Sequence, residues 1–436
     1  MADSGDRRPP EEVVGGTHSG AISIIQRGNL KALEQTLRRQ WRLGQNIVLC
    51  WSADERGLLV IFVPHYFLGN YCADDAEHRG NEAFIRELIA GRRQRSRDEL
   101  FAICERLGVA PTFIKLNTAL SEEPVLLAEV EQLIRRYGIS YVEDRGVLLF
   151  DIVEFSLHTP FEQASQLNSL SYSLNSAYNK LLAQGIEINF ARTTTGDGYY
   201  VWNRRLGPDA NADLFYFLLL VVADNAVARA QSRGNTVPVI RAAYHIGGHY
   251  ELYQAEGVNP TMFSYIVGDV TIELARIVDL ASPNQILVGE FTTLGGPPGQ
   301  AAASVSSPAF VAACNRGLSA LVGSQLSGKV VEEMQCTLSS YQDRDGLSKP
   351  LRLRFTDKHG LTHHAYNLQL RIDLEGRQLE LGVSCSLPEL DASSGTQPAG
   401  VKPAVTRCEP AGTVEELIDD LSDLLIRRGG RNKADH

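Results

Sequence analysis

From Gly146 onward, strand-like and helix-like segments follow one another in an order that restricts the fold. The β-prone run GVLLFDIVEF precedes an amphipathic helix through residues 161–181, the strands INFART and GYYVWN, and an apolar helix at 210–232. The strand VPVIRAAYHIG then completes a β-α-β-β-α-β order, which is the ferredoxin-like arrangement. We therefore expect an α+β domain whose antiparallel sheet carries helices on one face.

Further elements follow this core. A helix is expected at 270–280, then the strand QILVGE, and later the strands LRLRFTD and HHAYNLQLRI, which turn at KHG. Residues 291–350 begin with a stretch rich in Gly, Pro, Ala and Ser, which is typical of a loop, so we interpret them as an insertion. The main domain is accordingly expected to cover residues 139–387.

The remaining segments flank this domain. Residues 1–19 are polar and rich in Pro and Gly, and are expected to form a disordered tail. Residues 20–138 contain a helix with Leu33, Leu37 and Trp41 on one face, a strand pair, and helical stretches near 82–107 and 122–138. They predict a small α/β domain, regulatory or scaffolding in role. A linker at 388–412 and a C-terminal helix at 413–428 complete the chain.

Composition excludes several classes of protein. The net charge of −10 is unlike that of a general nucleic-acid binder, which is usually basic. The longest apolar run, Leu214–Ala223, is too short to span a membrane, and the N-terminus has no apolar core of the signal-peptide kind. Seven cysteines without a C-x-x-C pair argue against a disulfide framework or a cysteine zinc site. We expect a cytoplasmic protein with neither nucleic acid nor membrane as partner.

Two aspartates suggest a metal site. Asp151 ends the strand in FDIVEFS, and Asp197 lies in a tight GDG turn between two other strands. If those strands are neighbours, both carboxylates emerge at one edge of the sheet and form a hard-oxygen site for Mg²⁺ or Mn²⁺. Two such ions can bind triphosphate oxygens and activate a hydroxyl. The alternative is structural, because strand-ending aspartates and GDG hairpin turns are common.

Two cations come later in the chain. Arg276 follows Asp269 by seven residues on the predicted helix, and Lys358 lies in the turn TDKHG. Either residue alone is most simply a solvated surface cation. The order of the two aspartates and the two cations is more distinctive than any one of them.

In this order the chain resembles the catalytic domain of class III nucleotidyl cyclases. The matching segments are FDIVEFS, TTTGDGYYVW, AAYHIGG, YIVGDVTIELARIVDLASPNQILVGE and RFTDKHGLTHHAYNL, which span residues 146–370. ASPNQILVGE after the GD-helix is specific to this family, as is FDIVEFS with TGDG at the expected interval. The resemblance identifies the domain at 139–387 as a ferredoxin-like cyclase domain with an insertion.

The resemblance implies roles for these residues. Asp151 and Asp197 would hold two Mn²⁺ or Mg²⁺ ions together with the carbonyl of Ile152. The amides after Asp151, up to those of Phe155 and Ser156, would cradle the β- and γ-phosphates. Arg276 would stabilise the transition state at the α-phosphate, and Lys358 would pair with the triphosphate. Because the sites of this family form between subunits, a homodimer with two interfacial active sites is implied.

The base-selecting positions depart from the purine cyclases. The family places a lysine (for adenine) or a glutamate (for guanine) where this chain has Thr193, and an aspartate or cysteine where it has Tyr265. The family's asparagine before the transition-state arginine is Ile272 here. The hydroxyls of a threonine and a tyrosine suit a smaller ring. The stretch ARTTTGDG, with Arg192, resembles the pyrimidine (Pycsar-type) cyclases of bacterial antiphage defence, whose cyclic UMP or cyclic CMP activates an effector.

The expected function is therefore conversion of UTP to cyclic UMP and pyrophosphate. CTP stays open, because both hydroxyls can donate or accept and so do not distinguish uracil from cytosine. An adenylate cyclase with an unusual base pocket is a second alternative. A silent, nucleotide-sensing cyclase homology domain is a third, favoured by Ile272 but opposed by the retained aspartates and cations. The histidines His359, His363 and His364 are expected to be solvent-facing strand residues rather than metal ligands.

Overall fold

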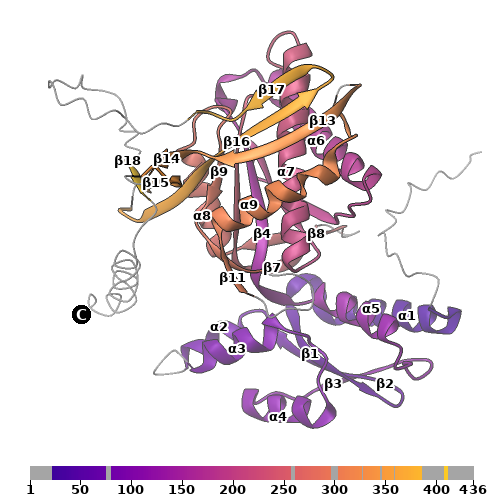
Figure 1. Ribbon diagram of the computed structural model, residues 1–436. Coiled ribbons are helices and arrows are strands. Elements are labelled where there is room, and N and C mark those ends of the chain that lie inside the picture. Colours follow the sequence, from indigo (N-terminus) through magenta and orange to yellow (C-terminus); the bar gives the residue numbers. More distant parts are fainter. Residues whose placement is uncertain are drawn as a thin grey trace, which may run out of the picture. The chain divides into compact units, whose positions relative to one another are not determined.

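The computed structural model describes residues 22–74, 80–256, 261–295, 303–326, 328–343, 346–357, 359–384 and 407–410 (Figure 1). The predicted tail at 1–19 and the C-terminal helix at 413–428 lie outside these residues, as does the predicted linker at 388–412 apart from residues 407–410. The contacts within the chain divide it into two units, Met1–Tyr141 with Glu251–Tyr265, and Val142–Tyr250 with Ile266–His436.

The first unit contains a three-stranded antiparallel sheet in the order β1-β2-β3. The predicted strand pair is β1 and β2, which form a hairpin with Asp54 opposite Gly57. Leu33, Leu37 and Trp41 are buried in its core, as their helical spacing predicts. The elements are α1 (Ile24–Trp41), η1 (Arg42–Gly44), β1 (Asn46–Asp54), β2 (Gly57–Pro64), α2 (Phe67–Ala73), α3 (Gly80–Ala90), α4 (Arg97–Leu107), β3 (Thr112–Lys115) and α5 (Pro124–Arg135).

The predicted helical stretch at 82–107 consists of two helices, α3 and α4. Between them the amide of Arg95 donates to the carbonyl oxygen of Trp51 at 2.8 Å, so the chain leaves the helix and runs beside β1. Ser96 then caps α4 through a capping box with Glu99. The cap signal is present in the sequence, but the contact with β1 is not visible there.

The second unit is built on one large sheet. The start of β4, the end of β7 and most of β8 belong to the first unit. The elements through the last core strand are β4 (Ile139–Ile152), η2 (Phe155–Leu157), α6 (Pro160–Ala183), β5 (Phe190–Thr194), β6 (Gly198–Asn203), α7 (Pro208–Gln231), β7 (Ile240–Glu256), β8 (Thr261–Val267), α8 (Asp269–Asp279) and β9 (Ile286–Gly289). The later elements are β10 (Thr292–Gly295), β11 (Ala303–Ser306), α9 (Ser307–Gly317), η3 (Leu318–Leu321), β12 (Gln325–Leu326), β13 (Lys329–Leu338), β14 (Ser340–Gln342), β15 (Ser348–Thr356), β16 (Thr362–Leu374), β17 (Arg377–Leu381) and β18 (Arg407–Pro410).

The strand order confirms the predicted core of an α+β domain. The sheet runs β12-β13-β16-β9-β7-β4-β6-β5, so the chain order β4-α6-β5-β6-α7-β7 places β4 and β6 at the centre of the core. β6 pairs antiparallel with both β4 and β5. β7 and β9 are parallel, however, so the sheet is mixed rather than wholly antiparallel.

Both faces of this sheet carry helices. Leu148 and Phe150 of β4 face α6 and α7, whereas the alternate residues Val147 and Leu149 pack with α8. The prediction that helices lie on one face was therefore wrong for α8. The physical reason is that the strand segment GVLLFDI is continuously apolar. Such a strand exposes apolar side chains on both of its faces, so protein must pack against both.

α7 is the apolar helix of the sequence. By length and composition it would suffice to cross a membrane, yet about two thirds (67%) of its most apolar window is buried within the protein. The run Leu214–Ala223 lies almost entirely in the core that α7 shares with α6, α9 and the sheet. α7 is thus a core helix of the second unit, as the short apolar run predicts.

The segment 291–350 contributes to the sheet. β13 pairs antiparallel with β16, and Met334 and Cys336 on β13 pack in the same core as Phe310 and Cys314 of α9. The residues between Gly295 and Ala303, within the Gly/Pro-rich stretch, lie outside the described residues. The predicted strand pair near the C-terminus is β15 and β16, which pair from Arg352↔Tyr366 to Thr356↔Thr362.

Candidate functional site

Asp151 and Asp197 lie at the same edge of the sheet, as the sequence predicts. In the β4-β6 ladder Asp151 is opposite Gly198, and the amide of Ile152 donates to the carbonyl oxygen of Asp197 at 3.0 Å. The strands approach so closely that a Cβ at Gly198 would lie 1.9 Å from the carbonyl oxygen of Phe150. Glycine is therefore required there for the two carboxylates to be neighbours.

The carboxylate of Asp151 has a cationic partner that the sequence reading missed. Arg241 on β7 donates from Nε to Oδ2 of Asp151 at 2.6 Å. Burial raises the pKa of Asp151, the bond and charge of Arg241 oppose this, and the carboxylates of Asp197 and Asp279 add to it. The only signal for Arg241 is its place between two buried strand residues, Ile240 and Ala242.

Arg241 also ties Asp151 to α8. Its Nη1 donates to the carbonyl oxygen of Ala281 at 3.2 Å, just beyond the end of α8. On the other side, the hydroxyl of Tyr200 on β6 donates to the carbonyl oxygen of Thr271 at 2.9 Å. The face of the sheet that presents Asp151 is thus the face that α8 covers.

Asp197 is more accessible than Asp151. It lies half-buried in its turn, where Oδ1 accepts a hydrogen bond from the hydroxyl of Thr195 at 3.1 Å. Within the described residues, no group of three or more His, Cys, Asp and Glu side chains is arranged to hold a metal ion. The donors at this edge are the two carboxylates and the carbonyl of Ile152. These hard oxygens fit Mg²⁺ or Mn²⁺, which often complete their coordination with substrate oxygens and water.

The turn after β4 leaves only part of the predicted phosphate cradle available, because the amides of Ile152 and Val153 already donate to the carbonyl oxygens of Asp197 and Val239. Glu154 adopts a left-handed conformation (φ 56°) and leads into η2, which begins at Phe155. Phe155 packs against the core between the sheet and α6, whereas Ser156 is exposed. The first amides of a helical turn have no acceptor within that turn and are available to an anion.

Arg276 lies in the last turn of α8 and is held there by an acid. Its Nε is 3.3 Å from Oδ2 of Asp357, and the Arg276 side chain is 25% exposed against 4% for Asp357. Asp357 follows β15 and directly precedes Lys358, which lies outside the described residues. The sequence reading did not single out Asp357.

The residues at the predicted base-selecting positions do not share one face of the sheet. Thr193 on β5 is half-buried, and its neighbour Ala191 on the same side of the strand packs in the core under α8. Arg192 points the opposite way, since its Nη1 donates to the hydroxyl of Ser171 on α6 at 2.8 Å. Tyr265 on β8 belongs to the first unit, so its part in the site stays a prediction. Ile272 on α8 is 57% exposed.

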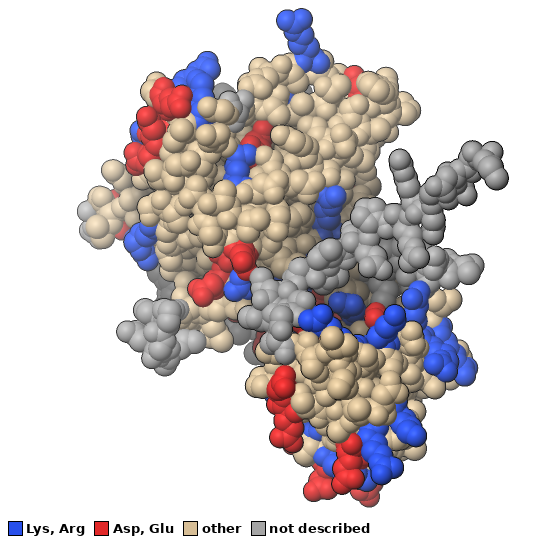
Figure 2. Space-filling view, turned by 90° about the vertical axis from the view of Figure 1, so that its right-hand side faces the viewer, with Lys and Arg blue, Asp and Glu red and all other residues tan. Residues whose placement is uncertain are grey.

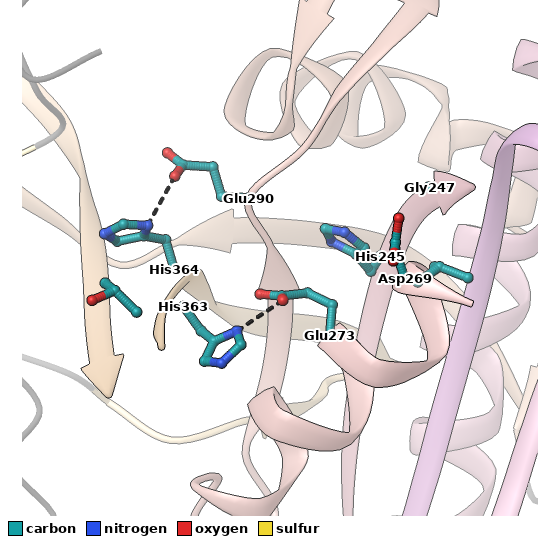
Figure 3. Close-up of a pocket in the computed structure, with 9 residues that line it drawn as sticks. His245, Gly247, Asp269, Glu273, Glu290, His363 and His364 are labelled. Carbon is teal, nitrogen blue, oxygen red and sulfur yellow. Dashed lines mark hydrogen bonds and ion pairs between the residues drawn. The ribbon is translucent and has the colours of Figure 1, made fainter. Parts of the chain in front are cut away.

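A pocket of about 290 Å³ opens beside α8. In Figure 3 Glu273 points toward His363 and Glu290 toward His364. The His363 Nδ1 is 2.8 Å from Oε2 of Glu273, and its Nε2 is 3.5 Å from Oδ2 of Asp357. The remaining lining residues are His245, Gly247, Asp269, Val270 and Thr362. The expectation of solvent-facing histidines was wrong for His363, which is buried.

The pKa values of the two buried histidines of this pocket, His245 and His363, are shifted in opposite directions. The hydrogen bond to Glu273 raises the pKa of His363, against the effect of burial, and Asp357 adds to the increase. Burial lowers the pKa of His245 to about 4, and Glu273 offsets this only in part. His245 Nδ1 has no hydrogen-bond partner within the part of the chain that the structure describes. His245 is therefore neutral near pH 7.

The molecular surface carries charges of both signs. On the face in Figure 2, Lys and Arg side chains occur alongside Asp and Glu, with large uncharged areas between them. The net charge of −10 therefore does not form a face of a single sign on this side of the molecule.

No family model matches this chain, and no curated protein matches it. Solved structures do resemble it, among them the following three. The adenylyl cyclase CyaB from P. aeruginosa is 11% identical over 53% of this chain and 95% of its own, with a TM-score of 0.32. The guanylate cyclase domain of RhGC from Catenaria anguillulae in complex with GTP is 16% identical over 38% and 95%, with a TM-score of 0.27. The non-canonical dimeric guanylyl cyclase domain of the RhoGC fusion protein from Blastocladiella emersonii is 13% identical over 52% of this chain and 97% of its own, with a TM-score of 0.31.

Proposed function

We propose that this protein is a pyrimidine nucleotide cyclase that converts UTP to 3′,5′-cyclic UMP and pyrophosphate. The observation that carries the proposal is the placement of Asp151 and Asp197 at one edge of the sheet, fixed by the 3.0 Å bond between Ile152 N and Asp197 O. Two converging carboxylates beside a helical turn suit a triphosphate with its divalent cations. The family resemblance of the motifs supplies the reaction type.

Different residues are proposed for different parts of the cyclisation reaction. The 3′-hydroxyl of the substrate gives up its proton to water as its oxygen attacks the α-phosphorus, the bond from that phosphorus to the bridging oxygen breaks, and pyrophosphate leaves with its electron pair. Mn²⁺ or Mg²⁺, when bound, would supply charge neutralisation and lower the pKa of the hydroxyl. Asp151, Asp197 and the Ile152 carbonyl would hold these ions. Of the amides after Asp151, those of Ile152 and Val153 already donate to the carbonyl oxygens of Asp197 and Val239, so the proposed donors to the β- and γ-phosphates are the amides of Phe155 and Ser156.

Arg276 stabilises the charge that develops on the α-phosphate. Its Nε contacts Asp357, and no other protein acceptor lies within hydrogen-bonding distance of its guanidinium among the described residues. The two terminal nitrogens are therefore available to phosphate oxygens, with which a guanidinium forms strong, directional bonds. Lys358 pairs with the triphosphate in the same proposal.

The proposed active unit is a homodimer. One protomer supplies Asp151 and Asp197, and the second supplies Arg276, Lys358 and the base contacts. Each half has its own charge partner within one chain, because Arg241 pairs with Asp151 and Asp357 pairs with Arg276. This separate neutralisation suits two half-sites that are stable before they meet.

Thr193 and Tyr265 are the proposed base contacts, and Arg192, which directly precedes Thr193, is a further proposed substrate contact. Their hydroxyls serve uracil and cytosine alike, so cytidylate cyclase is the first alternative. Adenylate cyclase and a silent nucleotide-sensing domain are the others. We place the protein in the cytoplasm, where its cyclic product would activate a separate effector during antiphage defence.

The test is a product assay. Purified protein is incubated with Mn²⁺ and each of the four ribonucleoside triphosphates separately, and the products are identified by mass. Cyclic UMP from UTP alone is the expected result, with the Asp197→Ala variant as the negative control. Cyclic CMP from CTP alone would name the other pyrimidine, and product from ATP would contradict the pyrimidine assignment. No cyclic product from an intact dimer would contradict cyclase activity.

A further inference from the structure

We propose that Asp357, aligned by His363, is a positioning residue that locks Arg276 and the turn containing Lys358 into one unit. The inference rests on the proposed cyclase function, in which Arg276 and Lys358 contact the same triphosphate. Neither Asp357 nor His363 would touch substrate. Both act by setting where Arg276 is held relative to the β15-β16 hairpin.

The first observation is a closed set of contacts between α8 and the β15-β16 hairpin. Oδ2 of Asp357 lies 3.3 Å from Arg276 Nε and 3.5 Å from His363 Nε2. The other ring nitrogen of His363 is 2.8 Å from Glu273, which lies one helical turn before Arg276 on α8. The helix is thereby attached to the hairpin at two points, Arg276 to Asp357 and Glu273 to His363, and the two hairpin side chains lie 3.5 Å apart.

The second observation is that Asp357 also builds the turn. Its Oδ1 accepts the amides of His359 at 2.8 Å and Leu361 at 2.9 Å, and its own amide donates to the carbonyl oxygen of Leu361 at 2.9 Å. The two carboxylate oxygens therefore have different partners. Oδ1 fixes the turn in which Lys358 lies in the sequence, and Oδ2 fixes Arg276.

The two hairpin side chains are shielded from water. The side chains of Asp357 and His363 are 4% and 7% exposed. A charge pair that is shielded from water keeps its geometry better than a solvated one, because few water molecules compete for its partners. Arg276, at 25% exposure, is held at Nε while the far end of its guanidinium stays accessible.

Asp357→Asn is the informative variant, because the asparagine side-chain oxygen can still accept the turn amides while the charge toward Arg276 and His363 is lost. The chain offers a matched control in Asp343→Asn. Asp343 opens a turn of the same D-x-x-G-L form, in which its Oδ1 accepts the amide of Leu347 at 2.9 Å. Its carboxylate pairs with Lys349 at 3.0 Å rather than with Arg276.

The first readout does not depend on turnover. Hydrogen exchange of the full-length protein is followed by mass spectrometry in peptides that cover the end of α8 and residues 357–364. Asp357→Asn should speed exchange in both segments, and Arg276→Ala should speed it in the hairpin. Asp343→Asn should change neither. Unchanged exchange at α8 in Asp357→Asn would overturn the link between the two elements.

The second readout is a double-mutant cycle on the rate of cyclisation. Asp357→Asn should lower kcat by about tenfold or more, with a smaller change in KM, because a displaced catalytic group affects the transition state most. The same substitution made in Arg276→Ala should have little further effect, since its target is gone. Equal losses in both backgrounds, or an equal loss in Asp343→Asn, would overturn the positioning role.

The two proposals fail in different ways. A wild-type protein that yields no cyclic product contradicts the proposed function, whereas the exchange data still decide whether Asp357 connects Arg276 to the hairpin. A wild-type protein that is active, with an Asp357→Asn variant that matches wild type in kcat and exchange, contradicts only the positioning proposal.

Discussion

Arg241 donates from Nε to Oδ2 of Asp151 at 2.6 Å, so a carboxylate that we propose as a metal ligand has a counter-ion within its own chain. The pair is largely shielded, with Asp151 15% exposed and Arg241 24% exposed. A guanidinium and a divalent cation compete for the same oxygens. Metal binding at this edge of the sheet should therefore depend on Arg241 as well as on the ligands.

Replacing Arg241 by methionine should strengthen binding of Mn²⁺ by about tenfold, because a nearby cation that opposes a second positive charge is removed. The measurement is the concentration of free Mn²⁺ by electron paramagnetic resonance during titration of the protein in the presence of UTP. Arg352→Met, which removes a cation that pairs with Glu290 at 3.3 Å, is the control and should leave the affinity unchanged. Weaker Mn²⁺ binding in Arg241→Met would show that Arg241 orients Asp151 for the metal rather than competing with it.

Asp197→Ala should abolish cyclisation and leave the fold intact. Asp197 is half-buried in a turn and makes one side-chain hydrogen bond, to Thr195, so its removal should cost no more than about 1 kcal/mol of stability. Product formation and thermal unfolding are measured on the same preparation, with Thr195→Val as the variant that breaks only the hydrogen bond. Retained turnover in Asp197→Ala would exclude the two-metal site.

Arg276→Ala should lower kcat by about a hundredfold and change KM much less, since a contact to developing charge is worth most in the transition state. Steady-state rates over a range of UTP concentrations separate the two parameters. A rise in KM with unchanged kcat would assign Arg276 to ground-state binding instead.

His245 should make the protein sensitive to mild acid. Burial lowers its pKa in the folded protein to about 4, from an ordinary value of 6.5. The unfolded chain therefore binds a proton that the folded chain excludes, and the free energy of unfolding falls as the pH drops from about 6.5 to about 4, by up to about 3 kcal/mol. His363 acts with the opposite sign, because its pKa is raised, and its contribution is lost as the pH rises.

The check is urea unfolding of wild type and His245→Asn at pH 7.5 and pH 5. The variant should lose less stability between the two values than wild type does, whereas His359→Asn, at an exposed position, should follow wild type. Parallel losses in all three proteins would show that His245 is protonated without penalty.

Much of the second unit could be predicted because its local signals agree with its topology. The β-prone apolar run after Gly146 predicts a buried strand, and the helical spacing up to Leu181 predicts the helix that follows. Asp151 and Asp197 meet because neighbouring strands bring their ends to one edge. The turn glycine at 198 is part of the same motif.

The missed features depend on partners that are distant in sequence. Nothing near Arg241 reveals that it faces Asp151, since that pairing needs the β4-β7 neighbourhood. His363 and His364 are adjacent on a strand, so they point to opposite sides, and only the position of α8 determines that Glu273 meets His363. β13 was not predicted, because the Gly- and Ser-rich stretch before it made the whole segment look like a loop. Its place in the sheet comes from its pairing with β16.

Gly198 shows that an active site can be lost without any change to a residue that does chemistry. Its missing side chain lets β6 approach to where a single added carbon would collide with the backbone of β4. A methyl group there would push the strands apart and separate Asp151 from Asp197 while both remain in the sequence. If related sequences were judged only by their acidic and basic residues, such a chain would be counted as intact. The distance between its two carboxylates would nevertheless no longer suit metal ions.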